Sequence, residues 1–177
     1  FGLFIGSGVK TIGSYAFYNC TSITEVTVGN ILKSIGSYAF YNCKSFTAII
    51  LPDCFTTMGA SAFENCTKLT VAKLGQSLTA VPNMAFKNCT SLSEIVIPAT
   101  AKSIGNQAFY NNSGLATITM NEGLETIGSE VFYNNSGIMR FTIPGTVTSM
   151  GANCFYGCTN VTYLIFKDGT GTLNINN

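Results

Sequence analysis

The sequence predicts a β-rich repeat solenoid, in which units of one length stack into a single elongated domain. Two observations carry this prediction. Phenylalanine recurs every 23 residues without an insertion. Each interval also holds a short stretch in which apolar and polar residues alternate, as they do in a strand with one buried side. The apolar runs are short, and none reaches the roughly 18 consecutive residues that a membrane-spanning helix needs.

Several columns of residues keep the same register as the phenylalanines. An Ala, Val or Cys precedes each Phe, and an Ile, Val or Met stands five residues before it. Asn follows two residues later in most units, and Cys follows three residues later in most units. These columns predict one repeat domain over residues 1–177, with a half repeat at 1–11 and about seven full repeats. The repeats are marked by Phe17, Phe40, Phe63, Phe86, Phe109, Phe132 and Phe155.

The second half of each unit is predicted to be a short strand. In the fourth unit Leu92, Ile95 and Ile97 form the L-x-x-L-x-L pattern of a leucine-rich repeat. Stacking of such units places the strands side by side and parallel, and in a leucine-rich repeat these strands line the concave face. Proline follows three of these segments directly, and because proline has no N–H for the ladder, the strands should end there.

The first half of each unit is predicted to lie on the convex side. Ile35, Ala39, Phe40 and Cys43 have helical spacing, which favours a short helical turn over residues 37–42. The Ile-Gly step before it is expected to form a second short strand. Pro82 occupies this glycine column in one unit. Proline holds φ near −65°, so small size or strand termination, and not positive φ, should explain the glycines.

The ends of the chain depart from the pattern. Residues 3–9 fill the strand and connector columns of a preceding unit, and the polar segment 167–177 is expected to form a modest cap. We therefore expect the chain to be a piece of a longer surface protein or its terminal domain.

The unit Ile-Gly-x-x-Ala-Phe-x-Asn-Cys-x-x-Leu-x-x-Ile-x-Ile-Pro strongly resembles the BspA-type leucine-rich repeat over residues 3–166. Isolated units depart from it, at Pro82, Asn112, Val131, Asn135 and Cys154. The resemblance implies a large secreted or surface-attached protein of a bacterium or protist. It implies adhesion to host or neighbouring-cell proteins, including extracellular-matrix proteins. It carries over no catalytic residue.

Composition argues against an enzyme. The chain has no His, which removes the usual general base, the commonest metal ligand and the Ser-His and Cys-His nucleophile pairs. Nine Lys and Arg against eight Asp and Glu leave a net charge of +1, so no basic field exists for nucleic acid or an anionic membrane. We expect no cofactor, no metal, no nucleic-acid partner and no membrane insertion.

The seven cysteines favour packing over chemistry. Five occupy one repeat column, where stacked side chains are parallel and poorly aimed for disulfides. Buried free Cys behaves as a small hydrophobe, although whether any pair forms is left open. Cys54 lies outside the column and is the best candidate for a reactive thiol, with an ordinary loop residue as the favoured alternative.

Residues between the buried positions of each strand should point outward and form a binding surface. Apolar and aromatic residues beside an Arg suit protein recognition, whereas plain β-propensity explains Thr, Val and Ile equally well. The candidates are Glu25, Ile50, Val71, Lys73, Glu94, Val96, Arg140, Tyr163 and Ile165. For the tyrosines that follow the spine phenylalanines, a packing role is favoured.

The leading hypothesis is an extracellular or cell-surface module that binds a protein partner, possibly a matrix protein, through the concave face. The alternative is a structural spacer or accessory domain of a larger secreted protein, with glycan binding as a weaker option. The sequence does not determine the ligand, the source, the oligomeric state or whether the Asn-x-Ser/Thr sites are glycosylated.

Overall fold

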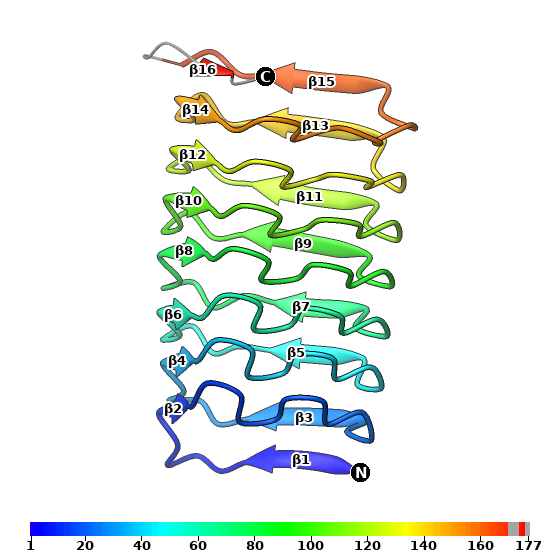
Figure 1. Cartoon of the computed structure of the whole chain (residues 1–177). Coiled ribbons are helices and arrows are strands. Elements are labelled where there is room, and N and C mark those ends of the chain that lie inside the picture. The colour runs from blue at the N-terminus through cyan, green and yellow to red at the C-terminus, as the bar shows by residue number, and fades with distance from the viewer. Residues whose placement is uncertain (170–173, 176–177) are drawn as a thin grey trace.

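Each 23-residue unit makes one turn of a parallel β-solenoid. The computed structural model describes residues 1–169 and 174–175, and its turns follow one another in chain order along a single column (Figure 1). Paired residues in neighbouring turns are 23 positions apart, as in Leu3 with Val26 and Ile95 with Ile118. The predicted repeat solenoid is therefore confirmed.

The longer strand of every turn lies on one side of the column, which we call the long-strand face. All of its ladders are parallel, in three groups: β1 with β3, then β5 through β11, then β13 with β15. The ladder is interrupted between β3 and β5 and between β11 and β13. The concave curvature predicted for this face stays a prediction. The strands are β1 (Gly2–Ile5), β3 (Glu25–Val28), β5 (Ala48–Ile50), β7 (Val71–Lys73), β9 (Glu94–Ile97), β11 (Thr117–Met120), β13 (Arg140–Ile143) and β15 (Tyr163–Phe166).

A second set of two-residue strands lies on another side, as the Ile-Gly columns predicted. They pair as β2-β4-β6 and as β8-β10-β12-β14-β16. The last strand of this set belongs to the predicted cap, whose residues 170–173 and 176–177 lie outside the described part of the chain. The strands are β2 (Thr11–Ile12), β4 (Ser34–Ile35), β6 (Thr57–Met58), β8 (Ala80–Val81), β10 (Ser103–Ile104), β12 (Thr126–Ile127), β14 (Ser149–Met150) and β16 (Asn174–Ile175).

The predicted helical turn over residues 37–42 is wrong. This segment is a series of tight turns, in which Tyr38 and Asn42 adopt left-handed φ values of 57° and 60°. The N–H of Phe40 donates to the carbonyl of Ala62 in the next turn at 2.8 Å, whereas a helix would direct it four residues back along its own chain. Asn tolerates the left-handed region better than most residues, which accounts for the Asn column.

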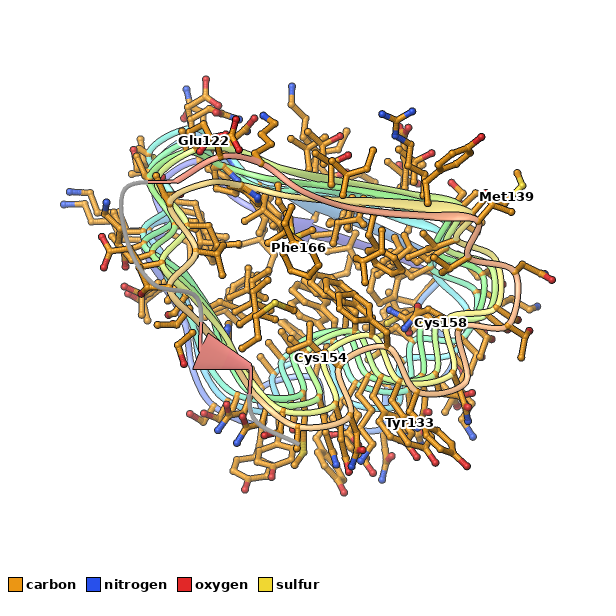
Figure 2. All side chains as sticks on the ribbon, turned by 90° about the horizontal axis from the view of Figure 1, so that it is seen from above. Glu122, Tyr133, Met139, Cys154, Cys158 and Phe166 are labelled. Atoms are coloured by element: carbon orange, nitrogen blue, oxygen red, sulfur yellow. The ribbon has the colours of Figure 1, made fainter. Side chains whose placement is uncertain are left out.

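The core is a stack of the spine phenylalanines. Phe40, Phe63, Phe86, Phe109 and Phe132 are fully buried, and neighbouring spine rings lie 5.1–6.1 Å apart between centroids. The first and last spine rings are only partly buried, because each has a neighbour on one side alone. Figure 2 looks along this axis and shows side chains packed inside the ring of backbone.

All seven cysteines are free, and the column cysteines Cys43, Cys66, Cys89 and Cys158 have a specific backbone partner. The thiols of Cys66 and Cys89 each donate to the carbonyl of the spine Phe one turn back, at 3.1 Å. Asn135 replaces Cys in this column, and its Nδ2 donates to Phe109 in the same way at 2.8 Å. Its buried Oδ1, and the Nδ2 of Asn112, have no partner among the described residues. The column therefore selects a small polar side chain: most members donate to a spine carbonyl, whereas the Oδ1 of Asn112 accepts from the N–H of Cys89 at 2.8 Å.

The glycine column reflects close approach of neighbouring turns. A Cβ placed on Gly59 would lie 2.2 Å from the backbone nitrogen of Ser37. No glycine of this column has a positive φ. Of the two predicted reasons, the close approach supports small size in the inner turns, and strand termination also fits, because each of these glycines directly follows a two-residue strand.

Candidate binding face

The predicted binding residues project from the long-strand face, as their alternation with buried residues required. Most are exposed, and they stand in two columns that run along the solenoid axis. Ile50 pairs with Lys73, and Val71 pairs with both Ala48 and Glu94. Ile165 is less exposed than predicted.

Apolar residues gather near the middle of this face. Ile50, Val71 and Val96 come from the adjacent strands β5, β7 and β9, and their exposed fractions are 60%, 44% and 50%. Lys73 and Glu94 stand among them. We call these five residues the central cluster. Exposed apolar residues framed by polar ones are the arrangement that protein interfaces use.

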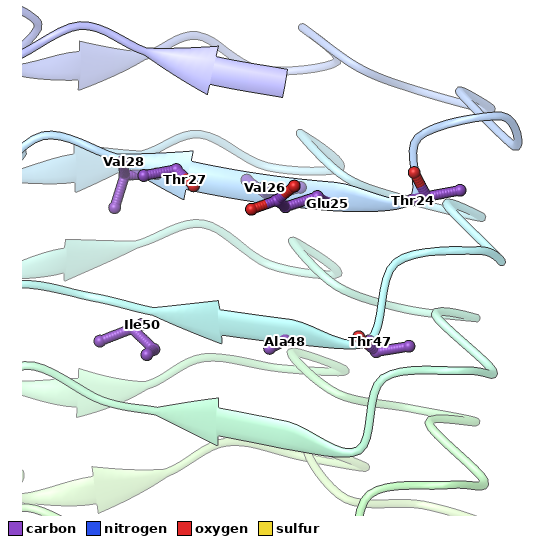
Figure 3. Close-up of a pocket in the computed structure, with 8 residues that line it drawn as sticks. All are labelled: Thr24, Glu25, Val26, Thr27, Val28, Thr47, Ala48 and Ile50. Atoms are coloured by element: carbon purple, nitrogen blue, oxygen red, sulfur yellow. The ribbon is translucent and has the colours of Figure 1, made fainter. Parts of the chain in front are cut away.

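The face is hollowed where the strands separate. One opening of about 400 Å³ lies between β3 and β5, which share no ladder, and Figure 3 shows its lining residues on the two strands. Glu25 and Ile50 contribute to its lining. A second opening of about 340 Å³ lies between β7 and β9, where Val71 and Glu94 form the one pair of the ladder. Both openings touch the central cluster. The repeat columns of the sequence could not have predicted these openings, because the openings depend on how far neighbouring strands lie apart.

Arg140 and Tyr163 form a second group of exposed residues. They are paired directly across β13 and β15, and the guanidinium carbon lies 5.9 Å from the centre of the Tyr163 ring. Met139, immediately before β13, is 62% exposed. We call these three residues the Arg–Tyr cluster.

Sequence reasoning missed Met139 because it stands just outside the alternating strand positions. The available signal was its column, which holds Thr, Ser or Ala in the other units. In several units that hydroxyl donates to the preceding turn, as Thr70 does to the carbonyl of Thr47 at 3.0 Å. A methionine there gives up this bond and presents an apolar side chain instead.

Tyrosines stack on the turns, on a different side of the solenoid from the long strands (Figure 2). Ring centroids are 4.9 Å apart between Tyr18 and Tyr41 and 4.7 Å apart between Tyr110 and Tyr133. Partial burial, followed by the Glu64 carboxylate, raises the pKa of Tyr41. The predicted packing role fits this geometry, because the rings direct their faces toward one another.

A second tyrosine column was missed by sequence reasoning. Tyr15 and Tyr38 stack at 5.0 Å in a column that the other units fill with unrelated residues. The missing signal was the left-handed backbone at this position, which the columns did not reveal.

The buried thiols are placed for structure and not for nucleophilic chemistry. Burial raises the pKa of Cys43 to about 12, and it raises the pKa of Cys66 as well. The Cys54 thiol donates to the carbonyl of Asn30 at 3.3 Å. The hydroxyl of Thr100, in the same column, makes the equivalent bond at 2.7 Å. The ordinary loop interpretation of Cys54 therefore fits better than a reactive thiol.

No group of three or more His, Cys, Asp or Glu side chains among the described residues could hold a metal ion. Within the same residues there is also no helix long and apolar enough to cross a membrane.

Comparison with protein families shows one match. The pattern of the family described as the BspA type leucine rich repeat region occurs in six copies, which cover residues 3–116 and 79–176. No curated protein matches the chain.

Several solved structures share the fold. A leucine rich cell surface protein from Faecalibacterium prausnitzii A2-165 is 26% identical with a TM-score of 0.86, over 95% of this chain and 48% of its own. A leucine rich repeat protein from T. pallidum is 25% identical with a TM-score of 0.81, over 90% and 78%. The pneumococcal vaccine antigen PcpA, at 17% identity and a TM-score of 0.67 over 95% and 51%, is similar in fold alone. The chain thus spans about half the length of the F. prausnitzii protein.

Proposed function

We propose, from the premise that this chain belongs to the BspA-type leucine-rich repeat family, that it is a non-enzymatic module of the cell exterior that binds a protein partner. The long-strand face is the binding surface in this proposal. The cell-surface description of the similar F. prausnitzii protein supports the location. An extracellular-matrix protein is the class of partner that we propose to test first.

The exposed central cluster is the observation that carries the proposal. Three β-branched side chains from adjacent strands face outward beside two openings. Propensity explains a β-branched residue at any one of these positions. It does not explain why the three apolar members of this class lie together, while the same columns hold Thr117 and Thr119, which are β-branched but polar, one strand further on.

The test is binding of the chain to immobilised extracellular-matrix and cell-surface proteins. An Ile50→Glu/Val96→Glu variant places two charges in the central cluster, and a Thr57→Glu variant places one in an exposed position of β6 on another side. We expect saturable binding that weakens at least tenfold in the first variant and persists in the second. Equal binding by the unaltered chain and by both variants would refute the long-strand face as the site.

A structural spacer is the second candidate. The continuous phenylalanine spine makes a regular column, and the chain covers only 48% of the similar F. prausnitzii protein. No saturable partner in the panel would favour this role. Glycan binding has less support, because the stacked tyrosines do not present open ring faces along the column.

A further inference from the structure

We infer that the Arg–Tyr cluster binds a carboxylate of the protein partner, an Asp or Glu side chain with an apolar residue beside it. This inference rests on the proposed function and specifies the chemistry of the partner at one end of the long-strand face. Three features carry it: the contact with the Tyr163 ring that orients Arg140, the absence of an acidic partner for it among the described residues, and the exposed apolar residues next to it in the chain and across the ladder.

The ring of Tyr163 orients the side chain of Arg140. The β13–β15 ladder places it directly opposite Tyr163, and the guanidinium carbon lies 5.9 Å from the ring centroid. A guanidinium that lies over a ring can keep N–H groups free, and a pair of these groups matches the two oxygens of a carboxylate. Because the side chain is already oriented, binding costs less conformational entropy than it would for a freely rotating cation.

The charge of Arg140 is not neutralised inside the described part of the chain. The two ion pairs found there join Lys102 to Glu125 and Lys167 to Glu122. The two acids that share the column of Arg140 are Glu25 on β3 and Glu94 on β9, and the nearer one, Glu94, lies two strands away, or about 10 Å at the usual strand spacing. The cluster therefore offers an anion site that no described residue fills.

A carboxylate fits this site better than a phosphate. A doubly charged phosphate recruits several cations, and Arg140 is the single cation of the cluster. On the same face Lys73 is three strands away on β7, and Lys167 beyond β15 is already paired with Glu122.

The apolar neighbours indicate what should accompany the acid. Met139 and Tyr163 are 62% and 61% exposed, and Tyr, Met and Arg are the residue types enriched in interface cores. An apolar partner residue that covers them removes water from the guanidinium. The lower local dielectric then strengthens the pairing with the carboxylate.

The experiment selects short random peptides, displayed on phage, for binding to the immobilised full chain. We expect the selected peptides to be enriched in Asp or Glu beside an aromatic or aliphatic residue. A synthetic copy of one such peptide should bind Arg140→Gln about tenfold to a hundredfold more weakly than the unaltered chain. Arg140→Lys should lie between the two, because it keeps the charge and loses the planar fork.

The matched control is Lys68→Gln, which removes the same charge from an exposed residue that precedes the β7 strand. We expect this variant to bind the peptide as the unaltered chain does. Replacing the peptide's acid by its amide should weaken binding to the unaltered chain and change little for Arg140→Gln. Melting temperatures near that of the unaltered chain establish that each variant is folded.

Each other outcome overturns a distinct claim. If the peptides bind Ile50→Glu/Val96→Glu more weakly but bind Arg140→Gln normally, the long-strand face is still a binding surface. The carboxylate site at Arg140 is then overturned. Equal loss in Arg140→Gln and Lys68→Gln shows an effect of net charge and also overturns it. If no selected peptide responds to any variant of the long-strand face, the carboxylate site and the proposed face both fail.

Discussion

The phenylalanine spine predicts that the cost of losing one ring depends on its position in the stack. Phe86 is fully buried, with Phe63 at 5.3 Å on one side and Phe109 at 5.7 Å on the other. Phe17, at the end of the stack, has one spine neighbour, Phe40, at 5.1 Å and is only partly buried. Leucine at either position keeps the apolar contact and removes the ring.

The expected magnitudes follow from counting ring contacts. An aromatic pair contributes about 0.5–1.5 kcal/mol beyond the area it buries. Phe86→Leu loses two such contacts, so the free energy of unfolding should fall by about 1–3 kcal/mol, and the residual cavity adds to this loss. Phe17→Leu loses one contact, which corresponds to about 0.5–1.5 kcal/mol.

Urea denaturation followed by circular dichroism measures these differences, with m values compared to establish that each variant unfolds in the same way. Phe4→Leu is the control, because Phe4 is 70% exposed and should lose almost nothing. Equal losses for Phe86→Leu and Phe17→Leu would refute the stacking argument, since they would show that ring neighbours do not determine the cost.

Three further predictions concern the repeat columns. Asn135→Cys should stabilise the fold by about 1 kcal/mol in the same urea assay. The change removes a buried Oδ1 that has no partner among the described residues, and it keeps a donor for the carbonyl of Phe109. A loss of stability would contradict this account. Gly59→Ala should destabilise by about 1–3 kcal/mol, since its Cβ would meet backbone at 2.2 Å, and an unchanged thermal midpoint would show that the turns can separate. Burial raises the pKa of the Cys43, Cys66 and Cys89 thiols in the folded chain. The free energy of unfolding should therefore be highest below pH 9 and should decline as the pH rises from about 9 toward 12, the folded pKa of Cys43. In the unfolded chain these thiols ionise first, so denaturation midpoints that stay level over this range would oppose the argument.

Residue spacing was sufficient to predict the solenoid, the columns and the outward-facing positions. Ile49 is buried and Ile50 is exposed because side chains alternate along a strand, whatever the neighbouring strands do. The spine position of Phe86 followed similarly, since a large apolar residue repeated at one period must meet its counterparts in the stack.

The predicted helical turn shows where spacing was insufficient. Ala39 and Cys43 are four residues apart and are both buried, as a helix would have them. The same two residues also face inward in a chain of turns whose amides bond to the next repeat. Spacing cannot distinguish the two arrangements, because the difference lies in the left-handed backbone of Tyr38 and Asn42 and in hydrogen bonds to residues 22 positions ahead.

The sequence by itself determined the period, the buried columns and the side of each strand that faces solvent. These properties follow from side-chain volume and polarity along one segment of chain. Only the tertiary structure decided that the ladder opens between β3 and β5, and that Arg140 lies over the ring of Tyr163 with Met139 exposed nearby. The physical reason is that the spacing between strands and the stacking of side chains depend on how two neighbouring turns pack against each other. The sequence of one repeat alone does not determine that packing.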